Sequence, residues 1–509
     1  MTASPSERIC VVVGRTRHKM VQAEIQEAAR RGARLIEVRL DFLAKAPDFK
    51  RLLADKPCAV MATVRRPADG GRWAGTEPDR RTLLRQAIVG GFDWVDLETD
   101  IADAVPRFGR VRRVVSYHNL HEVPGDLEKI HEKMCGQDPD VVKIAVRAQQ
   151  PEDNLRMLRL VQDAPRPTVA FCMGDMSMPS RVLGIKYGAP FTYAAFNPER
   201  GIAPGLPSFD ELKHIYHIDA IDGETQVFGV IGDPVAHSLS PLIHNAAFAH
   251  ERLNKVYLPF RVPKDDLPQT VSAFDWFPVE GYSVTLPHKE DVLGLTSGYD
   301  GPTREIGAAN TLYRMNDGAW RAANTDHDAA LECLVRELQP DPAAGTDASL
   351  SALAGRKVLI LGAGGVARAI ARGIVNHGGV LMIANRTKAR AEELADQFGC
   401  LLVEWQNRGA VFADVLVNCT SVGMHPNLDE TPFAENWLRE GMVVFDTIYN
   451  PERTLLIKHA RERECKTITG IDMFVRQAAQ QFELFTGQAA PVEVMRDVIR
   501  QAISAARPE

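Results

Sequence analysis

The sequence lacks the features that mark membrane, secreted and nucleic-acid-binding proteins. No apolar run approaches the roughly 18 residues that a membrane-spanning helix needs. The 60 basic and 66 acidic residues nearly balance and are interspersed, so they give no electrostatic footprint for nucleic acid or an anionic membrane. The 8 cysteines include no C-x-x-C pair, which argues against a disulfide scaffold or a cysteine zinc site. What remains is the ordinary composition of a globular protein.

We expect no targeting signal at the beginning of this sequence, because MTASPSE is short and polar and a strand pattern starts at Ile9. We therefore predict a reduced, cytoplasmic protein whose partners are small molecules. The length of 509 residues suggests about three domains, at roughly 150 residues each. The sequence leaves the oligomeric state open.

The first part of the chain, up to about residue 200, alternates strand-like and helix-like segments. Amphipathic helical patterns such as Lys19–Arg31 and Arg80–Val89 separate several of the strands. Strands with helix-sized connections pair in parallel. Eight such units predict a (β/α)8 TIM barrel, with an open doubly wound sheet as the alternative. The predicted strands are Ile9–Val13, Leu35–Leu40, Ala59–Val64, Trp94–Glu98, Val114–His118, Val141–Val146, Thr168–Cys172 and Phe191–Phe196.

A polar interval, Ile218–Gln226, separates the first half from a second α/β pattern that begins at Val227. Another weak interval, Gln339–Gly355, precedes the strongest strand pattern of the chain, Lys357–Leu361. A helical tail is predicted from Met473. Further strands are predicted at Val380–Ala384, Val415–Cys419, Met442–Asp446 and Lys466–Thr469.

Strand parity places many polar side chains inside the predicted barrel. Alternate residues of a barrel strand point inward, and active sites lie at the carboxyl ends of the strands. The apolar residues of each strand should meet the helices, so the others should line the interior. So many ionisable groups are too costly as core packing alone, although a structural ion pair is an even alternative for any one of them. The inward set is Glu37, Arg39, Thr63, Arg65, Trp94, Asp96, Glu98, Ser116, His118 and Lys143.

The lysine of this set suggests covalent chemistry. Neighbouring cations and desolvation both favour the neutral form of an amine, so Lys143 can act as a nucleophile and form a Schiff base with a ketone. His118 is placed to move protons, and Glu98 to orient it. An anionic substrate could be held by Arg39, Arg65 and Arg181.

Taken together, these residues resemble the type I 3-dehydroquinate dehydratases, over about residues 9–216. The resemblance implies that Lys143 forms the Schiff base with the substrate ketone. His118 would then remove the adjacent proton and assist loss of the hydroxyl as water, with Glu98 as its partner. Implied substrate contacts are Glu37, Arg39, Arg65 and Arg181. The matching segments are IEVRLD (Ile36–Asp41), ATVR (Ala62–Arg65), WVDLE (Trp94–Glu98), SYHN (Ser116–Asn119), VVKIA (Val141–Ala145), SRVLG (Ser180–Gly184) and APGLPS (Ala203–Ser208).

One loop departs from that family's pattern. The family usually reads S-A-P-G-Q there, with polar groups that close over the substrate. This chain reads I-A-P-G-L, so that Ile202 and Leu206 replace two polar residues. The Schiff-base residues are unchanged, and we expect a weaker or differently tuned dehydratase rather than an inactive one.

The second half contains a glycine-rich turn between a strand and a helix. After Leu361 the chain reads G-A-G-G-V-A, and a helical pattern follows over Val366–Val375. This is the dinucleotide-binding fingerprint with alanine at its last position. Its first glycine permits the tight turn, and the next lets the backbone approach a pyrophosphate at the helix N-terminus. The candidate cofactor contacts are Gly362, Ala363, Gly364, Gly365, Val366 and Ala367.

The next strand ends without the acidic residue that is typical of an NAD site. It is followed by Asn385, Arg386 and Thr387. A guanidinium suits a 2′-phosphate, so these residues predict NADP as the cofactor, with a solvated basic loop as the alternative.

Polar segments on both sides of the turn resemble, in order, the shikimate dehydrogenase family. They include S-L-S-P with Ser238 and Ser240, V-T-L-P-H-K with Thr285 and Lys289, and N-T-D ending at Asp326. The resemblance runs from about residue 227 to the end of the sequence. Two small departures are Ser283, where Asn is common, and Ala330, where Gly is common. Further matching segments are Asn310-Thr311, VNCTSVGM (Val417–Met424), DTIYNP (Asp446–Pro451) and GIDMFVRQA (Gly470–Ala478).

This second resemblance implies that Lys289 and Asp326 form a catalytic pair. A nicotinamide would donate hydride to the ketone of 3-dehydroshikimate, Lys289 would protonate the developing alkoxide, and Asp326 would tune and orient the lysine. Implied substrate contacts are Ser238, Ser240, Thr285, Asn310, Tyr449 and Gln477. Implied cofactor contacts are Asn385, Arg386, Thr387, Thr420 and Gly470.

Together, the two halves predict a bifunctional α/β enzyme. A TIM barrel at 1–220 would convert 3-dehydroquinate to 3-dehydroshikimate. A two-lobed module, with an α/β substrate domain at 225–335 and 471–509 and a Rossmann NADP-binding domain at 336–470, would reduce that product to shikimate. The rivals are a quinate dehydrogenase, against which Arg386 argues, and a regulatory protein, which would not need the catalytic groups. No metal site is predicted, because His118 and His121 point to different faces at the end of a strand.

Overall fold

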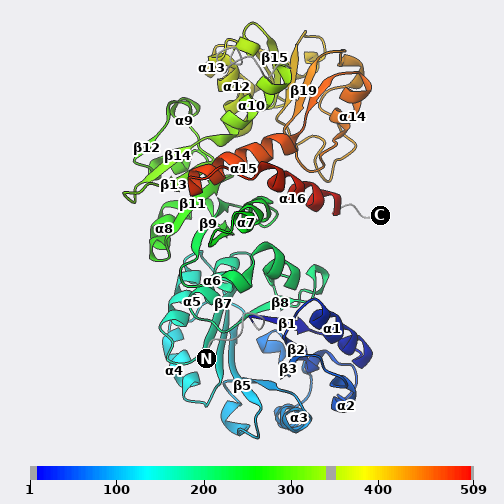
Figure 1. Ribbon diagram of the computed structural model, residues 1–509, viewed down its shortest axis with the longest axis vertical. Helices are drawn as coiled ribbons and strands as arrows, with labels where there is room; N and C mark the ends of the chain where they lie inside the picture. Colours follow the sequence, from blue (N-terminus) through cyan, green and yellow to red (C-terminus); the bar gives the residue numbers. More distant parts are fainter. Residues whose placement is uncertain (1–7, 340–350, 506–509) are drawn as a thin grey trace. The chain divides into compact units, whose positions relative to one another are not determined.

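The computed structural model describes residues 8–339 and 351–505 and divides into two compact units (Figure 1). One unit comprises Met1–Pro241 and Leu253–Val279, and the other comprises Leu242–Arg252 and Glu280–Glu509. Most of the predicted weak interval, residues 340–350, lies outside the described residues. The domain boundaries predicted from the sequence stay a prediction.

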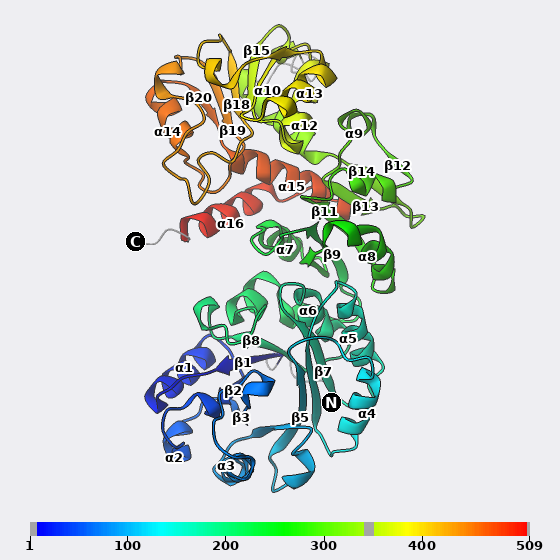
Figure 2. The same ribbon diagram turned by 180° about the vertical axis from the view of Figure 1, so that it is seen from behind.

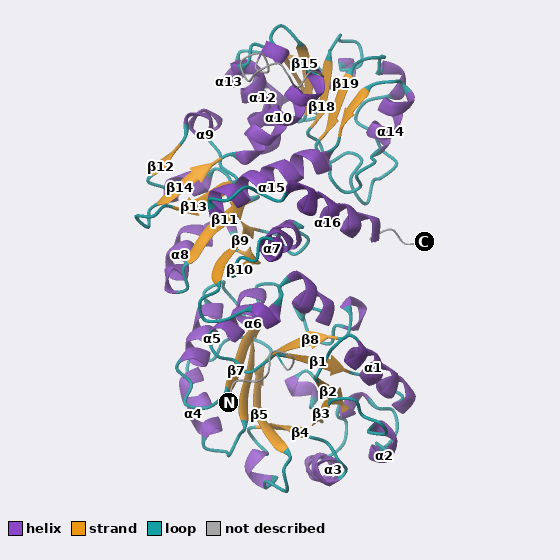
Figure 3. Ribbon diagram, viewed as in Figure 1, coloured by secondary structure: helices purple, strands orange, loops and turns teal. Residues whose placement is uncertain are grey.

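The first unit is built around an eight-stranded, all-parallel sheet with helices on its outside (Figures 1 and 3). The strand order is β7-β6-β5-β4-β3-β2-β1-β8, so β7 and β8 form the two ends of the nearly closed sheet. This confirms the predicted barrel, and each strand lies within two residues of its predicted bounds. The strands are β1 (Ile9–Val13), β2 (Leu35–Arg39), β3 (Ala59–Thr63), β4 (Trp94–Glu98), β5 (Arg112–Asn119), β6 (Val141–Arg147), β7 (Thr168–Met173) and β8 (Thr192–Ala195).

The barrel helices begin and end where local sequence signals place them. The side chain of Thr76 caps α3 by accepting a hydrogen bond from the backbone N–H of Asp79, and Pro78 fits the first turn of that helix. Each amphipathic helix turns its apolar side toward the strands; in α1 this side includes Val21 and Ile25. The helices are α1 (His18–Arg30), α2 (Phe49–Leu52), α3 (Glu77–Val89), α4 (Leu127–Cys135), α5 (Asp153–Gln162) and α6 (Met178–Lys186).

The first unit continues beyond the barrel into β9 (Gln226–Gly232), β10 (Lys255–Arg261) and α8 (Leu267–Ala273). β9 and β10 pair in parallel. In the second unit, β11, β13 and β14 form an antiparallel ladder, and β12 pairs in parallel with β14. The elements are α7 (Ser240–His250), β11 (Val279–Val284), β12 (Gly298–Tyr299), α9 (Gly301–Ile306), β13 (Thr311–Arg314), β14 (Trp320–Ala323) and α10 (Thr325–Leu338).

The rest of the second unit contains a parallel sheet in the order β17-β16-β15-β18-β19-β20. This arrangement is of the Rossmann type and confirms that part of the predicted fold. The elements are β15 (Lys357–Leu361), α12 (Gly365–Asn376), β16 (Val380–Ala384), α13 (Lys388–Phe398), β17 (Leu401–Leu402), β18 (Val415–Asn418), β19 (Val443–Asp446), α14 (Leu455–Glu462), β20 (Lys466–Ile468), α15 (Gly470–Thr486) and α16 (Val492–Ala505).

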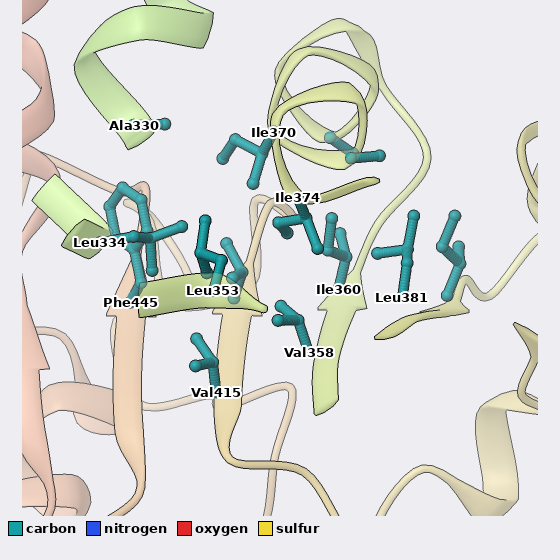
Figure 4. Close-up of a cluster of buried hydrophobic side chains, with 14 of the residues drawn as sticks. Ala330, Leu334, Leu353, Val358, Ile360, Ile370, Ile374, Leu381, Val415 and Phe445 are labelled. Atoms are coloured by element: carbon teal, nitrogen blue, oxygen red, sulfur yellow. The ribbon is translucent and has the colours of Figure 1, made fainter. Parts of the chain in front are cut away.

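Both faces of this sheet are buried. Alternate residues of β15 divide between the faces. Val358 and Ile360 pack with α10, α12 and α13 (Figure 4). Leu359 packs with residues of α14, a helix that Figure 2 shows on the other side of the sheet from α10 and α12. A strand that is covered on both sides reads as a continuous apolar run, which is why Lys357–Leu361 was the strongest strand pattern of the sequence. Within the described ranges, no helix is both long and apolar enough to cross a membrane.

Candidate active sites

The carboxyl ends of the barrel strands surround a cavity of about 270 Å³. Six of the residues predicted from the sequence line it, which are Glu37, Arg39, Arg65, His118, Lys143 and Arg181. They come from β2, the end of β3, β5, β6 and α6. The alternation of residues along each strand therefore correctly predicted which side chains of β2, β5 and β6 face the interior of the barrel.

Lys143 lies inside the barrel and is almost fully buried. Its Nζ lies 3.2 Å from Oδ2 of Asp96 and 3.8 Å from Oε2 of Glu37, and 4.0 Å from the centre of the Tyr193 ring. The expectation that cations surround this amine was therefore wrong in part, because two carboxylates face it. Asp96 also accepts a hydrogen bond from Ser116 at 2.6 Å.

Arg65 joins the acidic residues of the barrel to His118. Its guanidinium lies 2.9 Å from Asp96 and 3.3 Å from Glu98, and Nη1 lies 2.7 Å from Nδ1 of His118. Burial raises the pKa of Asp96, but Arg65 and Lys143 outweigh that effect and lower the value to about 2. Asp96 is therefore an anion that keeps these two cations in place.

Glu98 lies behind Arg65 and outside the cavity lining. Its other oxygen accepts a hydrogen bond from Arg80 of α3 at 2.5 Å. Burial raises the pKa of Glu98 to about 7 in spite of both arginines. In the part of the chain that the structure describes, no direct hydrogen bond joins Glu98 to His118, so the predicted partnership stays a prediction.

His118 is held as a neutral imidazole. Burial lowers its pKa well below the ordinary value, and Arg65, Lys143 and Arg39 lower it further. A neutral ring nitrogen can accept a proton at neutral pH, which is the property required of a general base.

Arg181 is the buried cation of this cavity that has no counter-ion. Its side chain is 1% exposed, and within the described residues neither of its Nη atoms makes a hydrogen bond. Nε donates to Ser177 Oγ at 3.2 Å, and the guanidinium lies 4.3 Å from the ring centre of Phe171. Arg39, by contrast, forms a bidentate pair with Asp41 at 2.9 and 2.8 Å. An unpaired guanidinium in a buried cavity is suited to bind a carboxylate.

The loop with the unusual sequence closes one side of the cavity. Ile202 and Leu206 both line the cavity and pack against the apolar interior of the barrel. The loop is fixed to the end of β7, because Gly174 N–H donates to the carbonyl of Pro204 at 3.2 Å. Gly205 has a φ of +69°, and a Cβ there would lie 2.2 Å from the carbonyl oxygen of Gly174, so only glycine fits.

A second cluster of polar groups lies in the second unit. Nζ of Lys289, which follows β11, lies 2.6 Å from Oδ2 of Asp326 in the first turn of α10. The side chain of Asn324 caps α10 by accepting from His327 N–H, which fixes the position of Asp326. Both side chains remain partly exposed, at 17% and 13%. The predicted catalytic pair is thus brought together.

Asn310 links this pair to the C-terminal helices. Its Oδ1 accepts from Thr325 N–H at 2.8 Å, and its Nδ2 lies 3.5 Å from Oε1 of Gln477 on α15. Gln481, one turn further along α15, donates to the carbonyl of Asn310 at 3.0 Å and accepts from Ser283 at 2.6 Å. Ser283, the residue that departs from the family pattern, is therefore a member of this hydrogen-bonded network.

The other predicted substrate contacts lie at ends of elements. Ser238 and Ser240 stand at the start of α7, where Ser238 Oγ accepts from Ser240 N–H at 3.2 Å. Thr285 follows β11 and is half-buried. Tyr449 is stacked on Phe474 of α15, with a ring separation of 4.8 Å. Their contacts with substrate stay a prediction.

The glycine turn, predicted to bind the dinucleotide, is a tight turn between β15 and α12. Gly362 has a φ of +114°, and a Cβ there would lie 2.9 Å from the carbonyl oxygen of Cys419. Gly364 and Gly365 are exposed at the N-terminus of α12, where backbone N–H groups can hold a pyrophosphate. A Cβ on Gly365 would lie 3.9 Å from Cδ of Lys289, so the turn adjoins the predicted catalytic pair.

The residues after β16 are the predicted contacts of the 2′-phosphate of NADP. Asn385 shapes the turn by donating from Nδ2 to the carbonyl of Thr387 at 2.9 Å. Arg386 is exposed, and none of the ion pairs among the described residues involves it. Thr420 and Gly470 follow β18 and β20, so both stand at the same edge of the sheet as the glycine turn.

Sequence reasoning missed several residues that support these sites. The alternation of strand residues placed Asp96 inside the barrel, but we assigned it no role. Arg80 lies on a helix, and strand alternation makes no prediction about helix contacts. The polar spacing of α15 contains Gln481 one turn beyond Gln477, a signal that could have been used. Arg147, Tyr193 and Gly70 also line the barrel cavity.

Known families match the two halves separately. Residues 9–222 match type I 3-dehydroquinase. Residues 230–312 match the shikimate dehydrogenase substrate binding domain, residues 346–446 match shikimate / quinate 5-dehydrogenase, and residues 470–500 match the shikimate 5′-dehydrogenase C-terminal domain. The fold and the two sites thus define a lyase followed by an oxidoreductase.

Individual relatives span either both halves or the second half. The bifunctional 3-dehydroquinate dehydratase/shikimate dehydrogenase, chloroplastic, of Arabidopsis thaliana is 36% identical over 96% of this chain and 84% of its own length. The shikimate dehydrogenase (NADP(+)) of Methanopyrus kandleri is 40% identical over 55% of this chain and 97% of its own length. A solved shikimate dehydrogenase in complex with NADP+ is 35% identical, with a TM-score of 0.50, over 56% of this chain and 97% of its own length.

The chain belongs to the family of bifunctional 3-dehydroquinate dehydratase/shikimate dehydrogenases. Both predicted activities are confirmed: dehydration of 3-dehydroquinate and NADP-dependent reduction of 3-dehydroshikimate to shikimate.

Proposed function

We propose that Lys143 performs the dehydration and Lys289 the reduction, at separate sites of this one chain. The observation that carries the first assignment is the unpaired, buried guanidinium of Arg181, which lines the same cavity as Lys143 and His118. That cavity offers an amine for a ketone, an imidazole for a proton and a guanidinium for a carboxylate. 3-Dehydroquinate carries a ketone, an adjacent acidic C–H and a carboxylate.

The dehydration begins when the ammonium of Lys143 loses a proton and the resulting amine attacks the ketone carbon. The ketone oxygen then leaves as water, which forms an imine. His118 then takes a proton from the adjacent carbon, and the electron pair is delocalised into the imine. The same imidazole returns the proton to the leaving hydroxyl, so the C–O bond breaks and water departs. Hydrolysis of the imine releases 3-dehydroshikimate and restores the amine.

Arg65 and Asp96 position these groups. Asp96 and Glu37 hold the Lys143 side chain, while Arg65 holds the His118 ring and keeps it neutral. Arg181 binds the substrate carboxylate, with Arg39 and Arg65 as further contacts. The role of Glu98 is indirect: it fixes Arg65 from behind.

For the reduction, bound NADPH supplies the hydride to the ketone carbon. Lys289 donates a proton to the ketone oxygen as negative charge develops there, and Asp326 holds the ammonium in position through their ion pair. Asn310, Thr285, Tyr449 and Gln477 bind the ring oxygens, and Ser238 and Ser240 bind the carboxylate.

The glycine turn, Gly362 to Ala367, binds the pyrophosphate at the N-terminus of α12. Arg386, with Asn385 and Thr387, binds the 2′-phosphate, while Thr420 and Gly470 border the nicotinamide side. The proposal also includes a reducing, cytoplasmic location, which the free state of all 8 cysteines supports. It requires no metal.

One coupled assay tests both assignments. Purified chain is mixed with 3-dehydroquinate and NADPH, and shikimate is measured by chromatography. We expect Lys143→Ala to make no shikimate from 3-dehydroquinate yet to reduce added 3-dehydroshikimate at the unchanged rate. Lys289→Ala should instead accumulate 3-dehydroshikimate.

The covalent step has its own test. Borohydride added during turnover reduces an imine, so the peptide that contains Lys143 should gain the mass of the substrate residue. Lys186→Ala, a lysine outside the cavity, serves as the control. Undiminished dehydration by Lys143→Ala would show that the Schiff-base assignment is wrong.

A further inference from the structure

Five basic side chains line the barrel cavity, and two of them have no anionic partner. Arg39 is paired with Asp41, and Arg65 and Lys143 are both paired with Asp96. The Nη atoms of Arg181 are unpaired, as described above. Within residues 8–339 and 351–505, no hydrogen bond or ion pair of the Arg147 side chain occurs either, and this residue is exposed.

β6 places Arg147 at the wall of the cavity. Lys143, Ala145 and Arg147 occupy alternate positions of the strand, and all three line the cavity. Arg147 is the last residue of β6 and lies in register with Met173 of β7, which lines the cavity as well. The strand therefore places the amine of Lys143 deep in the cavity. The guanidinium of Arg147, four residues further along β6, lies closer to the open side of the cavity.

The loop that closes the cavity offers no side-chain donor of its own. Its lining residues are Ile202, Ala203, Pro204 and Leu206, all of them apolar. Its carbonyls are in use: Pro204 accepts from Gly174 N–H, and Gly205 accepts from Ser177 Oγ, each at 3.2 Å. The side-chain donors that face a hydroxylated anion in this cavity therefore lie on the strand ends and on α6.

We infer that Arg147 is a substrate-binding residue of the dehydratase. Its guanidinium attracts the anionic substrate to the open side of the cavity and donates hydrogen bonds to a ring hydroxyl that the apolar loop leaves without a donor. Arg181 remains the carboxylate ligand at the buried side. This inference rests on the proposed function, since it takes the cavity to be the dehydratase site.

Arg147→Gln tests this role by removing the charge and keeping an amide of similar length. The KM for 3-dehydroquinate should rise about tenfold, as expected for a lost hydrogen bond to a charged group, while kcat stays within about twofold. Arg147→Lys should give an intermediate KM. Arg166→Gln, an exposed arginine before β7 at the opposite end of the barrel, is the matched control and should leave both constants unchanged.

The salt dependence of kcat/KM for dehydration distinguishes two roles of Arg147: attraction of the anionic substrate, or a structural role only. The kcat/KM of the wild-type dehydratase should fall as NaCl is raised, and Arg147→Gln should flatten that dependence, whereas Arg166→Gln should not. A kcat for dehydration that stays near the wild-type value reports that the barrel of each variant is folded, and reduction of 3-dehydroshikimate on the same samples reports on the second unit.

An unchanged KM with an unchanged salt dependence in Arg147→Gln would overturn the inference. So would a loss of kcat at constant KM, which would indicate a role in the chemical step. Neither result touches the proposed function, which stands or fails with Lys143→Ala.

Discussion

Nζ of Lys289 lies 2.6 Å from Oδ2 of Asp326, although the two residues are 37 positions apart. Asn324 and Asn310 hold the first turn of α10 so that the carboxylate faces the amine. An ion pair of this kind fixes where the ammonium delivers its proton.

Asp326→Asn should therefore impair reduction. We expect the kcat for 3-dehydroshikimate to fall about 100-fold, within the range for a positioned acid or base, while the ordered fold of α10 is retained. NADPH oxidation followed by absorbance measures the effect. Dehydration by the same sample should be unchanged, and a reductase of full activity would remove Asp326 from the mechanism.

The pH dependence of dehydration should reflect His118. Burial and three neighbouring cations lower its pKa below 6.5, so the neutral, basic form persists into more acidic solution than for a free imidazole. The acidic limb of kcat should accordingly lie below pH 6.5, as measured by formation of 3-dehydroshikimate between pH 4.5 and 8. An acidic limb centred above pH 7 would contradict this environment for His118.

Asp446 should make the second unit less stable as the pH rises. Burial raises its pKa to about 6 in spite of hydrogen bonds from Thr454, Ile448 and Asn418, so the folded chain favours the protonated acid. This stabilisation is complete below the unfolded pKa of 3.8 and is lost as the pH rises through 6. The loss amounts to about 3 kcal/mol, because the pKa of Asp446 is about 6 in the folded chain and 3.8 in the unfolded chain.

Asp446→Asn cannot titrate and removes that dependence. We expect the free energy of unfolding by urea of the variant, relative to wild type, to increase between pH 4 and pH 7.5. Circular dichroism at matched ionic strength follows the transition. A constant difference across this range would mean that Asp446 is ionised in the folded chain at every pH tested.

Arg386 should determine the preference for NADPH over NADH. Its exposed guanidinium has no ion-pair partner among the described residues and is free to bind a 2′-phosphate. Arg386→Ala should raise the KM for NADPH about tenfold, as for one lost charge-assisted contact, and leave the KM for NADH unchanged. Equal effects on both cofactors would point to a disturbed loop instead.

The strands that could be predicted are those that are buried on both sides. β1, β4, β15 and β16 have their predicted bounds, because a continuous apolar run flanked by turns leaves little choice of length. The short strands of the antiparallel ladder were not predicted, since their side chains mix buried and exposed positions. α15 begins at Gly470 rather than Met473, because Thr469 and Asp472 form a capping box whose spacing is visible in the sequence.

The sequence predicted which residues face the barrel interior, but not which of them form ion pairs with one another. Parity brought Glu37, Arg65 and Lys143 to one interior, yet it could not say which carboxylate would reach which cation. The contact of Lys143 with Asp96 and the support of Glu98 by Arg80 depend on side-chain lengths and on how far α3 lies from β4. Periodicity contains no information on such distances.

The ends of the barrel sheet, β7 and β8, are joined at the cavity by the loop after β8 rather than by strand pairing. The loop that lines the cavity therefore also links the two end strands of the sheet. Any movement of this loop away from the cavity would break its hydrogen bonds to Gly174 and Ser177. A ligand that holds the loop in place should therefore slow hydrogen exchange at the amide of Gly174, which lies at the end of β7.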